Sequence, residues 1–373
     1  MEETRKPTII LASGGTGGHI FPSQALAETL LKKNYNVHWF TDVRGHGFNQ
    51  MPEGVKTTIL PINKTTKKGA MRIALTILSI AKCTFSAYVS LRKIKPDVVV
   101  GFGGYPSAAT MACAILYRAP SIIHEQNAVL GRTNKILAKF TKRIALSFKN
   151  TQGVPTNAKP KTRYTGIPLR ATIKQLAKKQ YLSPSKEDTF NILVMGGSQG
   201  AKIFSDIVPA AVKHLPLALR KKISVRQQCR EEALEKTLES FKKCKIDATV
   251  TGFIDNVEEE LSKAHLVISR AGASTVSELI ASKRPTILVP YPHATNNHQY
   301  YNALSIEDVK GGWLVTEDKF KPARLSKMLE ALMTNPDKLT HASESLSHLY
   351  EESATDALAQ EVENLLQGLK DLK

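Results

Sequence analysis

The chain has 373 residues, which is too long for one ordinary hydrophobic core and favours two domains. Its composition, 42% hydrophobic and 23% charged, is that of a globular protein. The 52 Lys and Arg residues outnumber the 33 Asp and Glu residues and give a net charge of +19. This excess indicates an anionic partner, such as nucleic acid, anionic lipid or a phosphorylated substrate, unless the basic surface has no specific partner.

The cysteines and the apolar stretches limit the cellular context. The four cysteines form no CxxC pair and have no His cluster beside them, so we interpret them as reduced thiols packed inside a cytosolic protein. Residues 1–7 carry charges of both signs and no apolar run, so we expect no secretory signal. Residues 73–91 are interrupted by Lys82 and several Ser and Thr residues, which makes them a poor candidate for a membrane span of ~20 mostly apolar residues.

The N-terminal half alternates short apolar runs with helical patterns. β-Branched and apolar runs predict strands at residues 8–12, 37–40, 97–101 and 121–124. The first strand is followed by the glycine loop GGTGGH, residues 14–19, and then by the helical spacing of residues 24–33. A second glycine loop, GGYPS at residues 103–107, precedes an alanine-rich helix. This alternation indicates βαβ units and a parallel sheet.

The pattern restarts after residues 151–161, whose prolines, glycine and small polar residues are typical of a linker. Further strands are predicted at residues 190–195, 248–251, 266–269 and 286–289. A third glycine loop, GGSQGA at residues 196–201, opens a helix, and the tail from Leu325 is helical and amphipathic. The predicted fold class is therefore α/β, with Rossmann-like domains at residues 1–160 and 161–345 and a C-terminal helix at residues 346–373 that packs back toward the first domain.

Three glycine loops that follow strands suggest phosphate or sugar binding. Ligands of doubly wound sheets lie beyond the carboxyl ends of the strands, so we expect the site in the cleft between the domains. Free N–H groups and the helix dipole favour an anion there, although tight strand-to-helix turns also use such loops. No Lys follows residues 14–18 as a P-loop requires, and Ile20 replaces the last glycine of a dinucleotide fingerprint. Asp42 at the end of the second strand keeps a Rossmann oxidoreductase as an alternative.

Polar clusters follow three other strands. HEQN occupies residues 124–127, and RAGASTVSE, residues 270–278, opens a helix on which Glu278 lies about one turn from Ser274. The Glu278 carboxylate is suited to accept two ribose hydroxyls, or it is an ordinary glutamate in a helix first turn. The third cluster comprises His293, Asn296, Asn297, His298, Gln299 and Asn302. Its histidines have no adjacent carboxylate or Cys, which favours structural or sugar-binding roles over a metal.

Together these motifs resemble those of the MurG family, the bacterial N-acetylglucosaminyltransferases that convert lipid I to lipid II in peptidoglycan synthesis. The matching segments are GGTGGH at 14–19, GGYPS at 103–107, HEQN at 124–127, GGSQGA at 196–201, RAGASTVSE at 270–278 and HQYYNA at 298–303. The resemblance implies the two-domain glycosyltransferase type B fold (GT-B) and an inverting transfer of N-acetylglucosamine from UDP-GlcNAc to the 4-hydroxyl of MurNAc in lipid I.

The same resemblance implies the cellular setting. The enzyme would serve cell-wall biogenesis, cell shape and division as a peripheral protein at the cytoplasmic face of the bacterial cell membrane. Its expected partners are UDP-GlcNAc, undecaprenyl-linked lipid I and an anionic membrane surface, with no nucleic acid. The N-terminal domain would bind acceptor and membrane, and the C-terminal domain the UDP-sugar.

The resemblance also assigns residues to the substrates. Ser198 would lie at the diphosphate, Glu278 at the ribose and the backbone of Ile254 at the uracil, while Gln299 would contact the sugar. Further substrate-binding positions implied in this way are Thr16, Gly17, Gly18, Asn127, Arg170, Ala273, Ser274, Thr275, Val276 and Ser277. Residues 292–297 contain no acid, unlike many relatives, which puts an acidic role there in doubt.

Inverting transfer needs a base for the incoming hydroxyl. His19 is the first candidate because an imidazole can take up a proton near neutral pH. It is alternatively a hydrogen-bond donor to the acceptor diphosphate, and Glu125 is the competing base. The chain contains no D-x-D motif, so backbone donors at residues 196–201 are expected to stabilise the leaving UDP. We therefore expect no metal ion and no cofactor.

Residues 64–95 carry eight basic residues and no acid, which predicts membrane docking. The basic residues are Lys64, Lys67, Lys68, Arg72, Lys82, Arg92, Lys93 and Lys95, and the apolar residues among them include Ile73, Leu75, Ile77, Leu78, Ile80 and Phe85. A helix buried in the core is the other interpretation of the apolar part. Two other functions also stay open: another GT-B enzyme, such as a diacylglycerol glycosyltransferase or a UDP-sugar epimerase, and a non-catalytic donor-binding or membrane-docking subunit.

Overall fold

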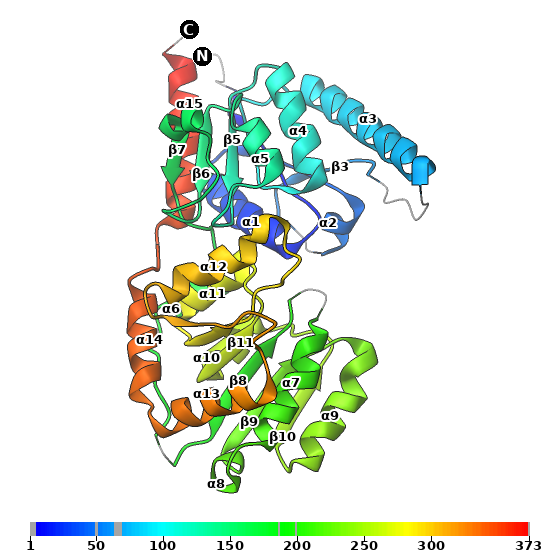
Figure 1. Ribbon diagram of the computed structural model, residues 1–373. Coiled ribbons are helices and arrows are strands. Elements are labelled where there is room, and N and C mark those ends of the chain that lie inside the picture. Colours follow the sequence, from blue (N-terminus) through cyan, green and yellow to red (C-terminus); the bar gives the residue numbers. More distant parts are fainter. Residues whose placement is uncertain (1–4, 49–50, 63–68, 186, 198–199, 372–373) are drawn as a thin grey trace. The chain divides into compact units, whose positions relative to one another are not determined.

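The computed structural model describes residues 5–48, 51–62, 69–185, 187–197 and 200–371 (Figure 1). The chain forms two compact units, each built on its own sheet. The first unit comprises Met1–Arg170 together with Glu352–Lys373, and the second comprises Ala171–Glu351. Both sheets are parallel throughout and are accompanied by helices, as the sequence predicts for the fold class.

The first unit has a seven-stranded sheet in the order β3-β2-β1-β4-β5-β6-β7. Its strands are β1 (Thr8–Ala12), β2 (Asn36–Thr41), β3 (Lys56–Ile59), β4 (Val98–Gly101), β5 (Ser121–Glu125), β6 (Arg143–Leu146) and β7 (Thr162–Tyr164). Its helices are α1 (Gly17–Lys32), α2 (Val43–Phe48), α3 (Gly69–Ile94), α4 (Gly104–Leu116), α5 (Arg132–Leu137) and α15 (Ala354–Lys370). Alternate side chains of β1 enter separate cores on the two faces of the sheet, Ile9 and Leu11 in one and Ile10 and Ala12 in the other.

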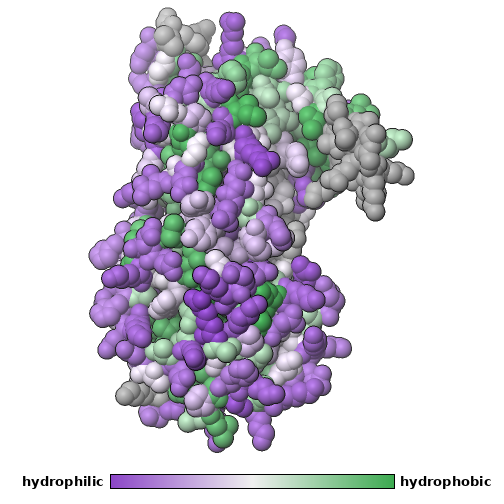
Figure 2. Space-filling view, in the orientation of Figure 1, coloured by the Kyte–Doolittle hydropathy of each residue, from purple (hydrophilic) through white to green (hydrophobic). Residues whose placement is uncertain are grey.

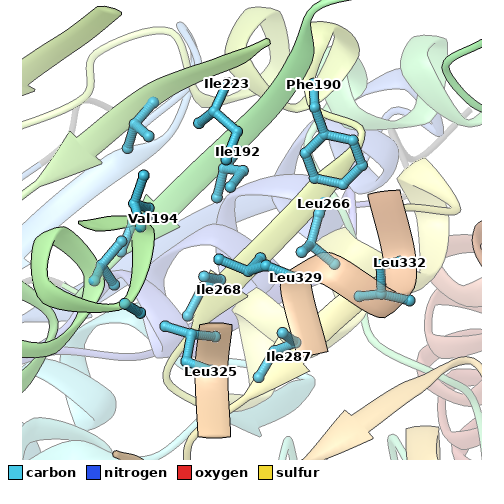
Figure 3. Close-up of a cluster of buried hydrophobic side chains, with 14 of the residues drawn as sticks. Phe190, Ile192, Val194, Ile223, Leu266, Ile268, Ile287, Leu325, Leu329 and Leu332 are labelled. Carbon is cyan, nitrogen blue, oxygen red and sulfur yellow. The ribbon is translucent and has the colours of Figure 1, made fainter. Parts of the chain in front are cut away.

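The second unit has a six-stranded sheet in the order β10-β9-β8-β11-β12-β13. Its strands are β8 (Phe190–Met195), β9 (Ile223–Gln228), β10 (Asp247–Thr251), β11 (Leu266–Ser269), β12 (Thr286–Leu288) and β13 (Gly312–Leu314). Its helices are α6 (Ala171–Ala177), α7 (Lys202–Lys213), α8 (Leu217–Arg220), α9 (Leu234–Lys243), α10 (Val257–Lys263), α11 (Ala273–Ser282), α12 (His298–Glu307), α13 (Pro322–Thr334) and α14 (Asp337–Ser347). Figure 3 shows the core in which leucines of α13 meet the apolar side chains of β8, β11 and β12.

Both sheets have a point at which the strand order changes direction. In the first it lies between β1 and β4, and in the second between β8 and β11. Ligands of doubly wound sheets bind at the carboxyl ends of the strands at such a point. All three predicted glycine loops follow these four strands, and so does the RAGASTVSE segment. The topology therefore places every one of these motifs where a ligand of its own sheet is expected.

The prediction of a linker between domains at residues 151–161 is wrong. This segment belongs to the first unit, where Ala158 is fully buried, η1 (Thr156–Lys161) forms a 3-10 helix, and β7 then pairs with β6. Proline and small residues serve here to pack an irregular connection rather than to separate domains. The domain boundaries expected after residues 160 and 345 stay a prediction, while the chain's contacts divide it after Arg170 and Glu351.

Two further expectations concern thiols and membrane spans. All four cysteines, Cys83, Cys113, Cys229 and Cys244, are buried and none is in a disulfide. Burial raises the pKa of the Cys83 and Cys113 thiols to about 11, so these side chains act as small apolar residues. Within the described ranges, no helix combines the length and the apolar character that crossing a bilayer requires.

Candidate functional site

Two glycine loops of the first unit meet at the carboxyl ends of β1 and β4. A Cβ atom at Gly104 would lie 2.6 Å from the carbonyl oxygen of Gly14, and a Cβ at Gly103 would lie 2.8 Å from Cε1 of His19. Gly103 and Gly104 also have φ of +104° and +84°, which favours glycine. The absence of side chains lets the loops touch and lets the His19 ring rest against Gly103. The amino ends of α1 and α4 are thereby brought together.

The first turn of α1 contains the predicted substrate-binding residues Thr16, Gly17 and Gly18. Thr16 is the exposed N-cap residue, and its carbonyl accepts the N–H groups of His19 and Ile20 at 3.1 and 3.2 Å. The N–H groups of Gly17 and Gly18 precede these bonds and belong to the free donors of a helix amino end. This turn is suited to an anion, as the sequence predicts for a glycine loop.

Glu125 ends β5 with a buried carboxylate that accepts four hydrogen bonds. Its Oε1 accepts from the backbone N–H and the side-chain amide of Asn127 at 3.0 and 3.1 Å. Its Oε2 accepts from the N–H of Gly131 and the amide of Asn134 at 2.9 and 2.8 Å. Four donors thus surround the two oxygens of this carboxylate. These bonds give Glu125 the role of shaping the loop after β5, and the choice between His19 and Glu125 as the base stays a prediction.

His124 and Gln126 connect His19 to the interior of the first unit. Nε2 of His124 lies 3.1 Å from the carbonyl oxygen of Gly166, and its Nδ1 lies 3.0 Å from Nε2 of Gln126. Oε1 of Gln126 lies 3.3 Å from Nδ1 of His19. Both His124 and Gln126 are buried. The sequence marked the HEQN motif but gave Gln126 no role, because nothing in one sequence shows which side chain it contacts.

Two arginines flank the glycine loop of the first unit. The Arg170 guanidinium, a predicted substrate contact, lies 4.5 Å above the centre of the Phe21 ring. Arg44, which the sequence did not single out, lies 3.1 Å from the buried carboxylate of Asp42, and a Cβ at Gly15 would be 3.8 Å from it. Asp42 also accepts the N–H of Gly45 at 2.8 Å. Its carboxylate therefore organises the start of α2, a local role distinct from the ribose contact of a dinucleotide site.

In the second unit, the loop after β8 leads into α7. Gly197 and Gly200 have φ of +77° and +63°, and α7 begins at Lys202 with no acid in its first turn. The amino end of α7 is therefore open to a negatively charged group. Ser198, the residue assigned to the diphosphate, lies outside the described residues together with Gln199.

α11 follows β11 and contains most of the predicted donor-site residues. It begins at Ala273, and the N–H of Val276 donates to the Gly272 carbonyl at 2.9 Å, so the first-turn donors are those of Ala273, Ser274 and Thr275. Val276 is fully buried, whereas Ser274 and Thr275 are partly exposed. The Val276 side chain therefore lies inside the second unit, and its predicted substrate contact stays a prediction.

The remaining donor-site predictions lie on the same unit. Ser277 is 8% exposed, Glu278 9% and Ile254 4%. The side-chain oxygen Oε1 of Gln299 accepts hydrogen bonds from the backbone N–H groups of Tyr291 and Ala271 at 2.9 and 3.3 Å. These bonds fix the amide so that its nitrogen is the end available to donate to a ligand.

A metal site in a protein of this kind would need several His, Cys, Asp or Glu side chains close together. Where the structure describes the chain, no three His, Cys, Asp or Glu side chains gather as metal ligands would. Nδ1 of His298 lies 2.8 Å from the carbonyl oxygen of Thr295. This contact gives the His298 ring a structural role.

Comparison with known proteins covers nearly the whole chain. Residues 9–146 match the glycosyltransferase family 28 N-terminal domain, and residues 191–361 match the glycosyltransferase family 28 C-terminal domain. A UDP-N-acetylglucosamine--N-acetylmuramyl-(pentapeptide) pyrophosphoryl-undecaprenol N-acetylglucosamine transferase from Paramagnetospirillum magneticum is 42% identical over 363 residues, which cover 97% of this chain and 98% of that one. A transferase of the same name from Rickettsia bellii is 38% identical over 339 residues, 91% of this chain and 94% of the other.

Solved structures of glycosyltransferases and related enzymes have a similar fold. Acinetobacter baumannii MurG matches with a TM-score of 0.75 and 28% identity over 98% of this chain and 100% of that one. A putative UDP-N-acetylglucosamine 2-epimerase from Listeria monocytogenes matches with a TM-score of 0.70 over 98% of each chain, but at 12% identity it shares the fold alone.

Proposed function

The chain belongs to glycosyltransferase family 28, and on this premise we propose that it transfers N-acetylglucosamine from UDP-GlcNAc to lipid I, which gives lipid II for peptidoglycan synthesis. The observation that carries the proposal is the 42% identity to a transferase of that name over 97% of this chain. The two sheets add support, because each has at its own switch point a glycine-rich loop of the kind that binds anions. The first unit would bind the lipid-linked acceptor, and the second the UDP-sugar.

The reaction is an inverting displacement at the anomeric carbon of the donor sugar. The 4-hydroxyl oxygen of MurNAc forms the new bond to that carbon, and the bond from the carbon to the UDP phosphate oxygen breaks. The hydroxyl proton goes to His19, and UDP leaves with the electron pair. Charge grows on the UDP oxygen, where the amino end of α7 offers backbone donors. Glu278 would hold the ribose and Gln299 would donate to the sugar.

A direct assay tests the proposal. The protein is incubated with UDP-GlcNAc and a lipid I analogue, and the disaccharide lipid is measured by chromatography. Formation of that product with a new β linkage is expected. Transfer only to diacylglycerol, interconversion of the UDP-sugar without an acceptor, or UDP-GlcNAc binding with no turnover on a competent acceptor would each replace the proposal with another function of the fold.

Chelation of divalent cations is expected to leave the transfer rate unchanged. The physical reason is that the N–H groups at the start of α7 supply the positive potential that a cation provides elsewhere. The measurement compares initial rates with and without EDTA after dialysis. Loss of activity that magnesium or manganese restores would show that a metal ion performs this task.

We also propose that the first unit docks on an anionic membrane surface through α3. The side chains of Met71, Leu75, Leu78, Lys82, Phe85 and Val89 recur every three or four residues and all are exposed, which makes one stripe along the helix. Phe85 is 70% exposed and Leu78 51%. Figure 2 shows hydrophobic side chains along this part of the surface. The exposed stripe argues against the interpretation of α3 as a helix buried on all sides.

The opposite face of α3 explains how the stripe is presented. Cys83, Ala87 and Leu91 are buried in the core of the first unit, and the Cys113 thiol of α4 donates to the Thr84 carbonyl at 3.1 Å. The helix is therefore fixed by one face and offers the other. Lys82, Arg92, Lys93 and Lys95 are exposed. Lys64, Lys67 and Lys68 lie outside the described residues, as do the side chains of Arg72, Ile73 and Ile77.

The docking proposal predicts salt-sensitive binding to vesicles that contain anionic lipid. Each cation near such a surface is worth ~1 kcal/mol, and raising the salt concentration screens it. The double variant Leu78→Ser and Phe85→Ser should bind vesicles less tightly, because two apolar side chains that would insert into the lipid are lost. Replacing Lys64, Lys67, Lys68 and Arg72 with Gln should also weaken binding. Cosedimentation measures both effects.

The matched control is Leu217→Ser, which removes a 60% exposed leucine from the second unit. It should leave vesicle binding intact, and all variants should bind UDP-GlcNAc normally. Wild-type protein that ignores anionic vesicles at low salt, or α3 variants that bind like the control, would rule out this surface.

A further inference from the structure

A chain of three polar contacts runs from a backbone carbonyl inside the first unit to His19. It begins at the carbonyl oxygen of Gly166, passes through the imidazole of His124 and the amide of Gln126, and ends at Nδ1 of His19, with separations of 3.1, 3.0 and 3.3 Å. The two middle residues are 0% and 2% exposed. Burial makes this a fixed arrangement, since each polar group there needs its partner.

The direction of every proton in this chain follows from its inner end. A carbonyl oxygen only accepts, so Nε2 of His124 must carry a hydrogen to donate to Gly166. Burial lowers the pKa of His124 to about 4, so the ring is neutral and its Nδ1 holds a lone pair. Only the NH₂ end of Gln126 can donate to that lone pair. The Gln126 oxygen is thereby turned to His19, where it accepts a hydrogen from Nδ1.

We infer that Gln126 is a positioning residue that holds His19 in the Nδ1-protonated tautomer, with the lone pair of the ring on Nε2. The inference rests on the proposed function, in which His19 takes the proton of the acceptor hydroxyl. In solution the opposite neutral tautomer of imidazole also forms, and it has its lone pair on the nitrogen that faces Gln126. Gln126 removes that unproductive form, and His124 keeps the Gln126 amide from turning over.

The surroundings of His19 fit a neutral positioning partner. Its ring rests on Gly103, and the nearby imidazole of His124 is uncharged. The carboxylate of Glu125, which follows His124 in the chain, accepts hydrogen bonds from Asn127, Gly131 and Asn134. An amide oxygen orients His19 without the negative charge that would stabilise its imidazolium form.

Nitrogen-15 NMR of the histidine-labelled full-length protein tests the tautomer directly. The His19 signals are assigned by their loss in His19→Gln. Wild-type protein should show a protonated Nδ1 and an unprotonated Nε2. Gln126→Met should lose this preference and lower kcat by about tenfold, since base catalysis contributes ~10²–10⁴-fold and only part of the ring population stays productive. KM for UDP-GlcNAc should not change.

A second variant separates positioning from simple packing. Gln126→Glu should move the acidic limb of the kcat/KM profile to higher pH by about one unit or more, because a carboxylate beside Nδ1 stabilises the imidazolium. The control Thr141→Val removes a buried polar group of the first unit, a hydroxyl without a hydrogen-bond partner in the described part of the chain. It should alter neither the spectrum nor the pH profile.

Two results would overturn the inference. One is a wild-type His19 with its hydrogen on Nε2, and the other is a folded Gln126→Met variant with wild-type kcat and the wild-type tautomer. Failure of the proposed function looks different, because the lipid I analogue would then not be glycosylated by the wild-type protein at all, whatever the NMR signals show.

Discussion

Replacing His19 with alanine is expected to lower kcat by about 10²- to 10⁴-fold, the usual contribution of a general base. The ring lies against Gly103 at the junction of two glycine loops, and its Nδ1 is engaged by Gln126. Without the imidazole ring, no base accepts the proton of the acceptor hydroxyl as its oxygen attacks the donor sugar. Steady-state kinetics with a lipid I analogue measure the loss. In the plot of kcat against pH, the acidic limb that reports protonation of the base should be absent from His19→Ala.

Donor binding distinguishes a missing base from a damaged fold. His19→Ala should keep most of the wild-type affinity for UDP-GlcNAc, because the donor contacts proposed for Glu278 and Gln299 would lie in the second unit. His348→Ala, at an exposed histidine of that unit, serves as the control and should be as active as the wild type. A His19→Ala enzyme with near-normal kcat would end the base assignment and return Glu125 to consideration.

Replacing Glu278 with alanine is expected to raise KM for UDP-GlcNAc by about 10- to 100-fold. Loss of a hydrogen bond to a charged group costs ~1.5–3 kcal/mol, and Glu278 is nearly buried on α11, one turn beyond Ser274. The ribose hydroxyls would lose their acceptor in a place that water reaches poorly. Initial rates at varied donor concentration, together with calorimetric titration of UDP, measure the change.

The matched control is Glu330→Ala, which removes an exposed helical glutamate from the same unit. It should leave KM unchanged. Glu278→Gln should fall between wild type and Glu278→Ala, since an amide oxygen still accepts but carries no charge. Unaltered donor affinity in folded Glu278→Ala would reassign this carboxylate to a structural role on α11.

The strands that the sequence predicts are those with continuous apolar runs. β1, β8 and β11 begin and end where the runs do, because strands buried on both faces are apolar throughout. β3, β6, β7, β9 and β13 escaped prediction. For β3 and β7 the reason is that KTTI and TRY are short, polar and at the sheet edges. The start of α1 was also missed: glycines oppose helix formation, yet the helix begins at Gly17.

For the site, residue types were predictable and their partners were not. Motif spacing places Glu125 at the end of a strand and Glu278 on the helix that follows one, and both elements are present, while His19 lies on the first turn of α1. Whether Glu125 is a base or a loop organiser depends on donors from Gly131 and Asn134, and no periodicity indicates those contacts. The orientation of Gln126 depends on a carbonyl 40 residues further along the chain, at Gly166. Long-range hydrogen bonds of this kind are set by tertiary packing alone.

The helix α15 has a consequence for how the chain is made. Its Leu358, Ala359 and Val362 lie fully buried in the core that also contains Leu26 and Leu30 of α1, and Lys33 pairs with Glu363 at 2.9 Å. A ribosome delivers residues 171–351, the whole second unit, before it delivers α15. The second unit can thus fold co-translationally while the first still exposes an unfilled groove beside α1. A premature stop codon within α15 would therefore damage the half of the protein synthesised earliest.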